Sequence, residues 1–549
     1  MNLYERYATG PFDSPEDYRT KLKITVPENF NFGYDIVDVY AQEDPQKKAL
    51  VWCNDETERT FTFAEMSDLS NRAANFFRNH GIGKGDKVML ILKRRYQYWY
   101  ALVGLHKLGA VAIPATHLLT KKDIVYRNCA ASVKMILTVN EPEIRSHVEA
   151  ALPESPTVKT VASVGGAAEN WVDFDAEIEK ESAEWNRVET KSHEPILIYF
   201  TSGTSGHPKM VCHNQAYPLG HIVTAKYWQN VEDDKLHLTV SETGWAKAAW
   251  GKIYGQWICG AVVFVYDMEH FQAKALLEKI EKYKITTFCA PPTIYRFMML
   301  EDLSKYDFSS VKYSVVAGEP LSPEIFKLFR EKTGLSLKEG YGQTELAITV
   351  MTPPWIPSKP GSMGIPVPLY NVKLVDESGQ PVAVGENGQI AVDISKGHPV
   401  SLFEGYYRDE ERTKSVMHDG LYYTGDIAWQ DEEGYFWFVG RADDVIKSSG
   451  YRIGPFEVES ALLEHEAVFE CAVTPAPDPI RGQVVKATIR LHEGFTPSEE
   501  LKKELQRHVK ETTAPYKYPR IIDFVDEMPK TISGKIRRAV IKGTVKNGD

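Results

Sequence analysis

Residues Tyr199 to Lys209 read YFTSGTSGHPK and directly follow the apolar run ILI at residues 196–198. A buried strand that leads into a loop of Gly, Ser and Thr lets backbone N–H groups and hydroxyls converge on phosphate oxygens. The stretch lacks the Gly-Lys-Ser/Thr ending of a P-loop, and no G-x-G-x-x-G is present. It therefore predicts a phosphate-binding loop of another kind, although by itself it also fits a flexible surface loop.

Outward from this stretch, apolar runs alternate with segments of helical pattern. The runs KVMLIL at 87–92 and YSVVAG at 313–318 are rich in strand-forming residues. The segment that follows the second run has a helical pattern. Ser322 fits its N-cap, Pro323 its first position, and Gly334 lies just past its end. Strands that alternate with helices predict parallel sheets covered on both faces.

The length of 549 residues is too great for one hydrophobic core and indicates at least two domains. We predict an α/β fold with an N-terminal domain at residues 1–440, made of two βαβ-type subdomains with parallel-rich sheets. A smaller β-rich subdomain is expected at about residues 360–440, where short strands and Gly/Asp turns dominate. The polar run GRADDVIKSSGYRIGP at 440–455 then separates a small α+β C-terminal domain at 441–549.

The C-terminal domain is expected to contain one clearly amphipathic helix. Pro497 fits its first position, and Glu499 fits a capping box with Thr496. Leu501, Leu505 and Val509 follow at intervals of four residues and predict one buried stripe.

The composition limits the class of protein. A hydrophobic fraction of 43% and a net charge of −11 are typical of a soluble protein and disfavour a general nucleic-acid binder. The sequence shows no transmembrane segment, signal or Arg-rich transit pattern, and the six cysteines lack C-x-x-C spacing, so we expect a cytoplasmic protein without a zinc or disulfide framework. Residues 501–549 carry 12 Lys and Arg against 6 Asp and Glu, which fits an anionic ligand or, equally, a solvated basic surface.

Five further motifs follow the glycine-rich stretch along the chain: AGEP (317–320), EGYGQTE (339–345), YTGD (423–426), GRADD (440–444) and PKTISGK (529–535). One such match would be weak. Together, and in this order, they resemble the adenylate-forming superfamily of acyl-CoA synthetases, luciferases and peptide-synthetase adenylation domains. The resemblance covers about residues 30 to 540. It implies that an acid reacts with ATP to give acyl-AMP and pyrophosphate, and that the acyl group then passes to CoA, with Mg²⁺ assisting.

The resemblance also implies an ATP site. Its predicted residues are Thr201, Ser202, Gly203, Thr204, Ser205, Gly206, His207, Pro208, Lys209, Gly318, Glu319, Pro320, Glu339, Gly340, Tyr341, Gly342, Gln343, Thr344, Asp426, Arg441 and Lys535. Thr344 and Lys535 would contact the α-phosphate and the substrate carboxylate, and Glu345 would hold Mg²⁺; these three are the predicted catalytic residues. Asp426 would accept from the ribose hydroxyls, with Arg441 as a second sugar contact.

A second set of residues resembles the CoA contacts of medium-chain acyl-CoA synthetases. These are Ser449, Gly450, Tyr451, Arg452, Arg481, Lys510, Tyr518, Pro519 and Arg520. Arg and Lys suit the phosphates of CoA. Asp443 matches the hinge of the family, so the C-terminal domain is expected to be mobile.

The acid is less defined. Acetate and propionate enzymes of the superfamily have YWQTE where this chain has YGQTE with Gly342. Loss of the indole is expected to open room for methylenes, each worth about 0.8 kcal/mol when buried. With Trp245, Lys247 and Thr344 as further acyl-site residues, we expect a medium-chain, branched or aromatic acid. A short-chain acyl-CoA synthetase, a domain that loads a carrier protein and a silent acyl-nucleotide sensor are the alternatives, and the sequence is compatible with a homodimer.

Overall fold

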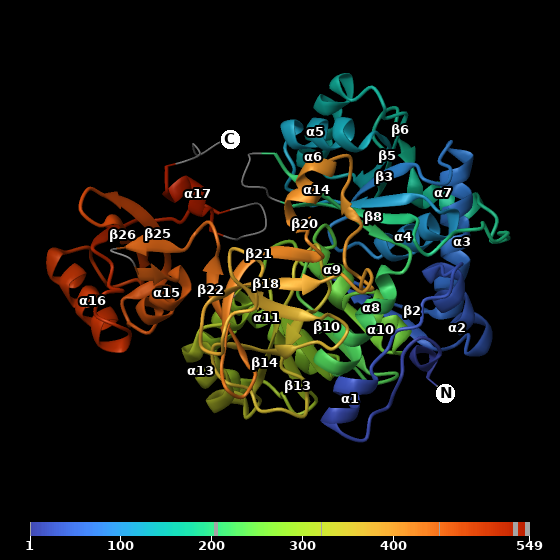
Figure 1. Ribbon diagram of the computed structural model, residues 1–549. Helices are drawn as coiled ribbons and strands as arrows, with labels where there is room; N and C mark the ends of the chain where they lie inside the picture. Colours follow the sequence, from blue (N-terminus) through green and yellow to red (C-terminus); the bar gives the residue numbers. More distant parts are fainter. Residues whose placement is uncertain (1, 202–206, 320, 449–450, 531–535, 544–549) are drawn as a thin grey trace.

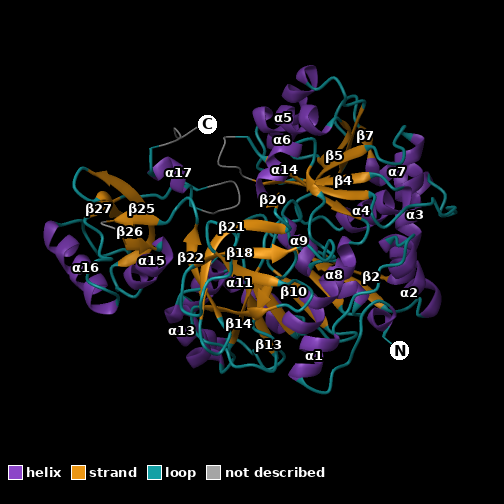
Figure 2. Cartoon of the chain, in the orientation of Figure 1, coloured by secondary structure: helices purple, strands orange, loops and turns teal. Residues whose placement is uncertain are grey.

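The computed structural model describes residues 2–201, 207–319, 321–448, 451–530 and 536–543. The expected α/β class is confirmed: three sheets carry the chain, and helices cover them (Figures 1 and 2). No helix among the described residues is both long enough and apolar enough to cross a membrane.

In the first sheet, the carboxyl ends of several strands border the predicted site. Its parallel half is β14-β13-β12-β10-β11-β1, with β2 antiparallel at the edge. The bounds are β1 Lys48–Cys53, β2 Glu58–Thr62, β10 Leu236–Thr239, β11 Val262–Tyr266, β12 Thr287–Ala290, β13 Tyr313–Val316 and β14 Leu337–Tyr341. Along β11, Val262 and Phe264 pack on one face and Val263 and Val265 on the other. Burial of both faces explains why the strands are continuous apolar runs.

The same sheet continues in antiparallel strands in the order β17-β18-β21-β22-β16-β15, which meet β14. Their bounds are β15 Val350–Met351, β16 Ser362–Pro366, β17 Val372–Val375, β18 Gly388–Asp393, β20 Met417–His418, β21 Leu421–Gln430 and β22 Phe436–Arg441. Short strands thus occupy the segment for which the sequence predicts a β-rich unit, and they bring residues 421–441 next to the end of β14.

The second sheet has the order β19-β9-β8-β4-β3-β5-β6-β7. Its strands are β3 Lys87–Ile91, β4 Val111–Pro114, β5 Val133–Val139, β6 Thr160–Val164, β7 Val172–Asp173, β8 Pro195–Thr201, β9 Lys209–Asn214 and β19 Gly405–Tyr406. Strands β4 and β8 run parallel, and β9 returns antiparallel to β8. The glycine-rich stretch is therefore the β8–β9 connection, at the carboxyl edge of β8.

Helices cover both large sheets. They are α1 Pro15–Lys21, α2 Asp38–Glu43, α3 Phe63–Asn79, α4 Gln97–Leu108, α5 Lys121–Ala131, α6 Pro142–Ala151, α7 Phe174–Lys180, α8 Tyr217–Val223, α9 Ala246–Gly251, α10 Tyr254–Ile258, α11 Ala273–Lys282, α12 Pro292–Met299, α13 Pro323–Thr333 and α14 Glu410–Val416, with short turns η1 Leu3–Arg6, η2 Gly33–Val37, η3 Leu152–Glu154, η4 Thr224–Trp228 and η5 Leu303–Lys305. Helix α13 has the predicted caps, because Ser322 accepts from the Ile325 N–H and Gly334 takes a φ of +75°.

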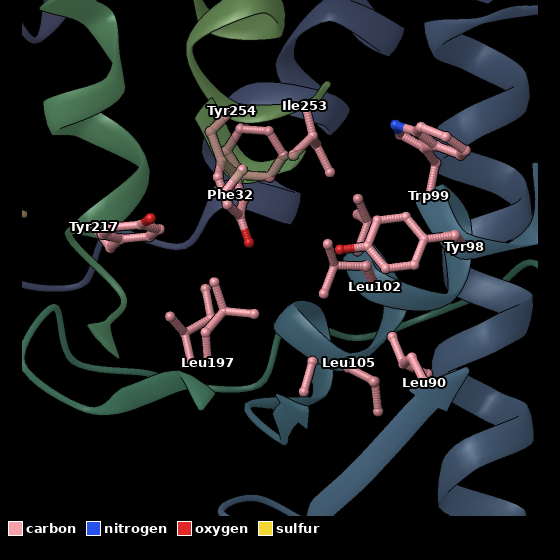
Figure 3. Close-up of a cluster of buried hydrophobic side chains, with 14 of the residues drawn as sticks. Phe32, Leu90, Tyr98, Trp99, Leu102, Leu105, Leu197, Tyr217, Ile253 and Tyr254 are labelled. Atoms are coloured by element: carbon pink, nitrogen blue, oxygen red, sulfur yellow. The ribbon is translucent and has the colours of Figure 1, made fainter. Parts of the chain in front are cut away.

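One core joins the two large sheets. Figure 3 shows side chains from α4, β8, α8 and α10 in a single cluster, among them Tyr98, Leu102, Leu197, Tyr217 and Tyr254. All five are at most 2% exposed. Aromatic side chains of this size dominate the burial energy of a core, so the two sheets are held as one body beneath the site.

The C-terminal unit has a sheet and a core of its own (Figure 1, orange to red). Its strand order is β24-β23-β26-β25, with β27 on β26. The elements are β23 Ile446–Ser448, β24 Tyr451–Ile453, α15 Pro455–Leu463, β25 Val468–Asp478, β26 Gly482–Leu491, α16 Glu499–Thr512, β27 Ile521–Phe524 and α17 Arg538–Ile541. The domain border at residue 440 stays a prediction; that residue lies inside β22, and the separate core begins at Ile446.

The amphipathic helix of this unit, α16, begins later than the sequence suggests. Its first residue is Glu499, and the Ser498 side chain accepts from the Leu501 N–H at 3.0 Å. Pro497 is thus outside the helix. The Ser498 side chain caps the first turn directly. In the predicted capping box, with Thr496 as N-cap, Ser498 would instead lie inside the helix and could not cap it. The predicted stripe of Leu501, Leu505 and Val509 is buried.

Candidate active site

The described residues on either side of 202–206 are held by strand pairing and by contacts with Tyr126. Thr201 ends β8 and pairs in register with Lys209 at the start of β9. His207 stacks on Tyr126 with ring centroids 4.9 Å apart, and the Tyr126 hydroxyl donates to the Pro208 carbonyl at 3.1 Å. Ser202, Gly203, Thr204, Ser205 and Gly206 lie outside the described residues. The anchored ends fix where the loop leaves and re-enters the sheet.

Lys209 and Glu345, which the sequence assigns to phosphate and metal, are joined by one tyrosine. Lys209 Nζ donates to the Tyr406 hydroxyl at 3.4 Å, and that hydroxyl donates to Glu345 Oε1 at 2.9 Å. Burial lowers the pKa of Lys209, and the nearby Glu345 carboxylate opposes this. Burial, and then Glu345, raise the pKa of Tyr406, so it stays a donor. Tyr406 lies in β19, far along the chain, and no motif in the sequence points to it.

A second cluster surrounds Asp426, the predicted ribose ligand. The Tyr341 hydroxyl and Gln343 Nε2 both donate to Asp426 Oδ2 at 2.6 Å, and Arg441 Nη1 lies 3.3 Å from Oδ1. Asp426 and Arg441 are register partners in β21 and β22. Burial, and then the charge of Asp426, raise the pKa of Tyr341 well above its ordinary value. All four residues named by the sequence therefore meet in one corner.

Further residues of the predicted ATP site occupy the loop after β13 and the end of β14. Gly318 has a φ of +105°, and Glu319 Oε2 accepts from the Thr293 hydroxyl at 2.8 Å. Gly340 leaves no room for a side chain, since a Cβ there would lie 2.5 Å from both Ile348 and Trp228. The positive φ therefore favours glycine at 318, whereas internal packing requires glycine at 340. Pro320 lies outside the described residues.

The Glu339 side chain lies in the interior and not on a surface where it could contact a ligand. Its Oε1 accepts from the Leu321 N–H at 3.4 Å. Burial raises the pKa of Glu339 to about 8. The carboxyl group therefore lies beneath the loop, and any contact of residue 339 with a nucleotide would come from its backbone.

Thr344 is positioned by a histidine that the sequence analysis missed. His213 Nε2 donates to the Thr344 carbonyl at 2.7 Å. Burial lowers the pKa of His213 to about 3, so the ring is neutral. The His213 ring stacks on the Tyr217 ring, with centroids 3.8 Å apart. His213 belongs to β9, so the phosphate-loop hairpin and the predicted catalytic turn are tied together.

The structure corrects the expectation of free space beside Gly342. A Cβ on Gly342 would lie 2.4 Å from the Ala347 carbonyl oxygen and 2.4 Å from Trp250 Cη2. The indole of Trp250, a residue of α9, therefore covers Gly342. Trp250 lies within the segment SETGWAKAAWGKIYGQW, but its spacing does not reveal which glycine it would meet.

The other two acyl-site candidates precede and begin the same helix. Trp245 is the N-cap residue of α9 and is half-buried. Lys247 Nζ donates to the Ala317 carbonyl at 2.7 Å. Lys247 thus connects the predicted acyl segment to the loop of Gly318.

The described members of the predicted CoA set lie in β24, in the β25–β26 turn, in α16 and in the turn before β27. Tyr451 stacks on Tyr516 at 4.2 Å, which joins the β23–β24 hairpin to the turn before β27. Lys510 Nζ and the Arg520 guanidinium lie 4.0 and 4.8 Å from the centre of the Tyr518 ring.

Of the remaining predicted CoA residues, some are described and the others lie outside the described residues. Arg481 is in the β25–β26 turn, where its backbone N–H donates to Asp478. Pro519 is buried. Arg452 is the strand partner of Lys447 in the β23–β24 pair. The hinge candidate Asp443 is exposed and lies 3.6 Å from Arg441. Ser449, Gly450 and Lys535 lie outside the described residues.

Comparisons with known proteins agree with this geometry. The description "AMP-binding enzyme" matches residues 37–407, and "AMP-binding enzyme C-terminal domain" matches residues 457–535. Human mitochondrial acyl-coenzyme A synthetase ACSM4 is 43% identical over 94% of this chain and 91% of its own. The crystal structure of a Brucella canis acyl-CoA synthetase covers 97% of this chain and 99% of its own, at 32% identity and a TM-score of 0.75.

A third relative carries a bound intermediate. The anthranilate CoA ligase AuaEII, solved with anthranoyl-AMP, has 28% identity and a TM-score of 0.86 over 95% of this chain and 98% of its own. One expectation is wrong against these findings: the curated relative is named as mitochondrial, which contradicts the cytoplasmic location expected from the sequence. The two family matches, the high identity and the shared fold together show that this chain belongs to the AMP-binding enzyme family and is an AMP-forming acyl-CoA synthetase that uses ATP and CoA.

Proposed function

We propose that the chain joins ATP and a carboxylic acid at the edge formed by the end of β8, the start of β9 and the turn after β14. The Lys209–Tyr406–Glu345 chain carries this proposal, because it brings a cation and a carboxylate to the same edge. The acid carboxylate attacks the α-phosphorus, and pyrophosphate leaves. Lys209 faces the phosphate charge, and the Thr344 turn meets the reacting groups.

Mg²⁺ fits the donors at this edge. The described residues contain no group of three His, Cys, Asp or Glu side chains that would hold a metal without substrate. Magnesium bound with nucleotide commonly needs only one or two carboxylates besides phosphates and water. Glu345 would hold the ion, which would neutralise the phosphate charge when bound.

The nucleoside end is proposed to occupy the Asp426 corner. Three donors already orient the Asp426 carboxylate, so it presents its remaining lone pairs in a fixed direction. A carboxylate can accept from both vicinal hydroxyls of a ribose. Gly318, where a Cβ would lie 3.8 Å from Lys247 Nζ and clash with no described residue, would let the backbone approach the adenine ring.

The second step is proposed to use the C-terminal unit, residues 441–549, as a mobile part. Asp443 would be its hinge, Lys535 would act in the first step, and the Tyr451–Arg520 surface would hold CoA. Support comes from the exposed stacked tyrosines and the cations over Tyr518, which suit a nucleotide with phosphates.

The acid is proposed to be of medium length, branched or aromatic. Trp250 forms a flat apolar wall at Gly342. Such a wall excludes a long straight tail along that line and favours a tail of medium length, a branched tail or a ring lying against the indole. The aromatic alternative also has support from the ligand named for the anthranilate ligase.

A panel of acids tests the proposal. Pyrophosphate release should require both an acid and ATP·Mg²⁺, and acyl-CoA, detected by mass spectrometry, should require CoA as well. Acid-dependent pyrophosphate release without CoA thioester would instead indicate loading of a carrier. ATP binding without pyrophosphate release would indicate a sensor.

Trp250→Ala should shift the preference among straight-chain acids toward longer ones. Removal of the indole leaves room for several methylenes, so the ratio of kcat/KM for a long acid to that for a short acid should rise roughly 10- to 200-fold. The melting temperature serves as the control for folding. An unchanged chain-length profile would show that Trp250 does not line the acyl site.

A further inference from the structure

The loop after β4 contains a histidine held by a buried carboxylate. His117 Nδ1 lies 3.2 Å from Glu242 Oε1, and the His117 backbone N–H donates to the same oxygen at 3.1 Å. The Thr116 hydroxyl donates to Glu242 Oε2 at 2.9 Å. Glu242 is buried, whereas 27% of the His117 side chain is exposed. The pair thus has a fixed inner end and an accessible outer end.

The charge of Glu242 defines the protonation of the histidine ring. Burial alone would raise the pKa of Glu242, but hydrogen bonds from His117 and Thr116 and the nearby charge of Arg94 hold it below its ordinary value. A carboxylate only accepts hydrogen bonds, so Nδ1 of the neutral ring carries the proton. Nε2 then keeps its lone pair, and no described residue hydrogen-bonds to it.

Sheet topology places this ring at the predicted active site. Strand β4 runs parallel to β8, with Ala112 opposite Leu197 (Figure 2 labels β4). The loops that follow two neighbouring parallel strands leave from the same edge. Residues 115–120 therefore leave the sheet at the edge where β8 ends. They lead into α5, whose Tyr126 contacts His207 and Pro208 just before β9.

On its other side, the His117 loop packs against the acyl-site segment. A Cβ on Gly244 would lie 2.4 Å from both the Ala115 carbonyl carbon and the Thr116 nitrogen. The next residue is Trp245, and Lys247 reaches the Ala317 carbonyl. His117 therefore lies at the edge shared by the ends of β4 and β8, beside the segment assigned to the acid. This is the edge at which the acyl–phosphate bond is proposed to form.

We propose that His117 is the general base that removes the thiol proton of CoA during acyl transfer, an inference that rests on the second step proposed above. The S–H bond breaks, and the proton moves to His117 Nε2. The sulfur forms a bond to the acyl carbon, and the acyl C–O bond to phosphate breaks, so AMP leaves with that electron pair. The imidazolium then gives its proton to solvent, and the balanced products are acyl-CoA, AMP and H⁺.

Glu242 is a positioning residue in this scheme. It holds the ring in the Nδ1–H form and stabilises the imidazolium, as the carboxylate of a catalytic triad does. The need for a base is chemical, because the thiolate is the nucleophile and only a few per cent of a free thiol is ionised at pH 7. Among the described residues, the charge of Arg94 also acts on Glu242.

The two half-reactions of His117→Asn test the role. Asparagine keeps an N–H donor for Glu242 but has no basic nitrogen. Acid-dependent ATP–pyrophosphate exchange should stay near the wild-type rate. Single-turnover formation of thioester from bound acyl-AMP at saturating CoA should fall roughly 100-fold, at the lower end of the usual effect of a general base. His147→Asn, on α6, is the matched control and should change neither rate.

Two further readouts separate proton transfer from structure. In His117→Ala, added imidazole should restore part of the thioester rate. In His117→Asn, that rate should rise about tenfold per pH unit below the thiol pKa of about 8.5, as the thiolate concentration does, whereas the wild-type rate should depend less steeply on pH.

The inference is overturned if His117→Asn forms thioester at the wild-type rate, if both half-reactions fall equally, or if the whole effect lies in the KM for CoA without rescue by imidazole. A wild-type enzyme that releases pyrophosphate but makes no CoA thioester would refute the proposed second step itself. The two failures are therefore distinguishable.

Discussion

The Asp426 corner and the Tyr451–Arg520 surface differ in how far their side chains are fixed without a ligand. Asp426 is 5% exposed and has three donors around it. Tyr451 and Tyr516 are 52% and 41% exposed and touch mainly each other. The corner costs little to organise when a nucleotide binds, because its groups are already oriented. The surface is open, which suits a part that is proposed to move between two steps.

The largest effect that separates the two regions is expected at the C-terminal unit. Lys535→Ala should reduce acyl-AMP formation at least about 1,000-fold, because a cation that meets the developing phosphate charge is lost. Formation of thioester from supplied acyl-AMP should be largely retained. Pyrophosphate release and a thioester assay measure the two steps. Equal loss of both steps would refute the assignment of Lys535 to the first step alone.

Asp426→Asn should give the next largest effect, and it should not separate the steps. The amide would direct an N–H group toward a corner made of donors, and one charged acceptor for the ribose would be lost. Hydrogen bonds to charged groups contribute about 1.5–3 kcal/mol, so kcat/KM for ATP should fall about 10- to 150-fold. Asp431→Asn, in the turn between β21 and β22, is the control. A change below twofold would show that Asp426 does not meet the nucleotide.

Glu339→Gln should leave both steps nearly intact and change stability with pH. The folded pKa of Glu339 is raised to about 8, above the unfolded value of about 4.3. The folded state thus holds a proton that the unfolded state loses, and wild-type stability from this group should fall as the pH rises between those values. The neutral amide lacks this dependence. Unfolding free energies from pH 5 to 9 should therefore diverge up to about pH 8, and parallel curves would contradict the buried protonated carboxyl.

Much of the fold could be predicted because local pattern and burial agree. The runs at 87–92 and 313–318 became β3 and β13, and Ser322 and Gly334 cap α13 as expected. The start of α16 was misplaced because two capping signals compete within three residues, and only the folded chain selects Ser498. The expected room beside Gly342 was wrong because a missing side chain in one segment says nothing about which indole another segment brings there.

The strand-then-loop pattern of YFTSGTSGHPK and the order of the motifs could be read from the sequence, and the family resemblance implied that Asp426, Arg441, Tyr341 and Gln343 belong to one ATP site. Tertiary structure alone decided the partnerships: Tyr406 between Lys209 and Glu345, His213 under Thr344, and His117 beside Glu242, 125 positions away. The physical reason is that a motif records which groups a backbone can present locally. Hydrogen bonds between distant segments depend on sheet register and on which loops share an edge, and these are set only when the whole core is packed.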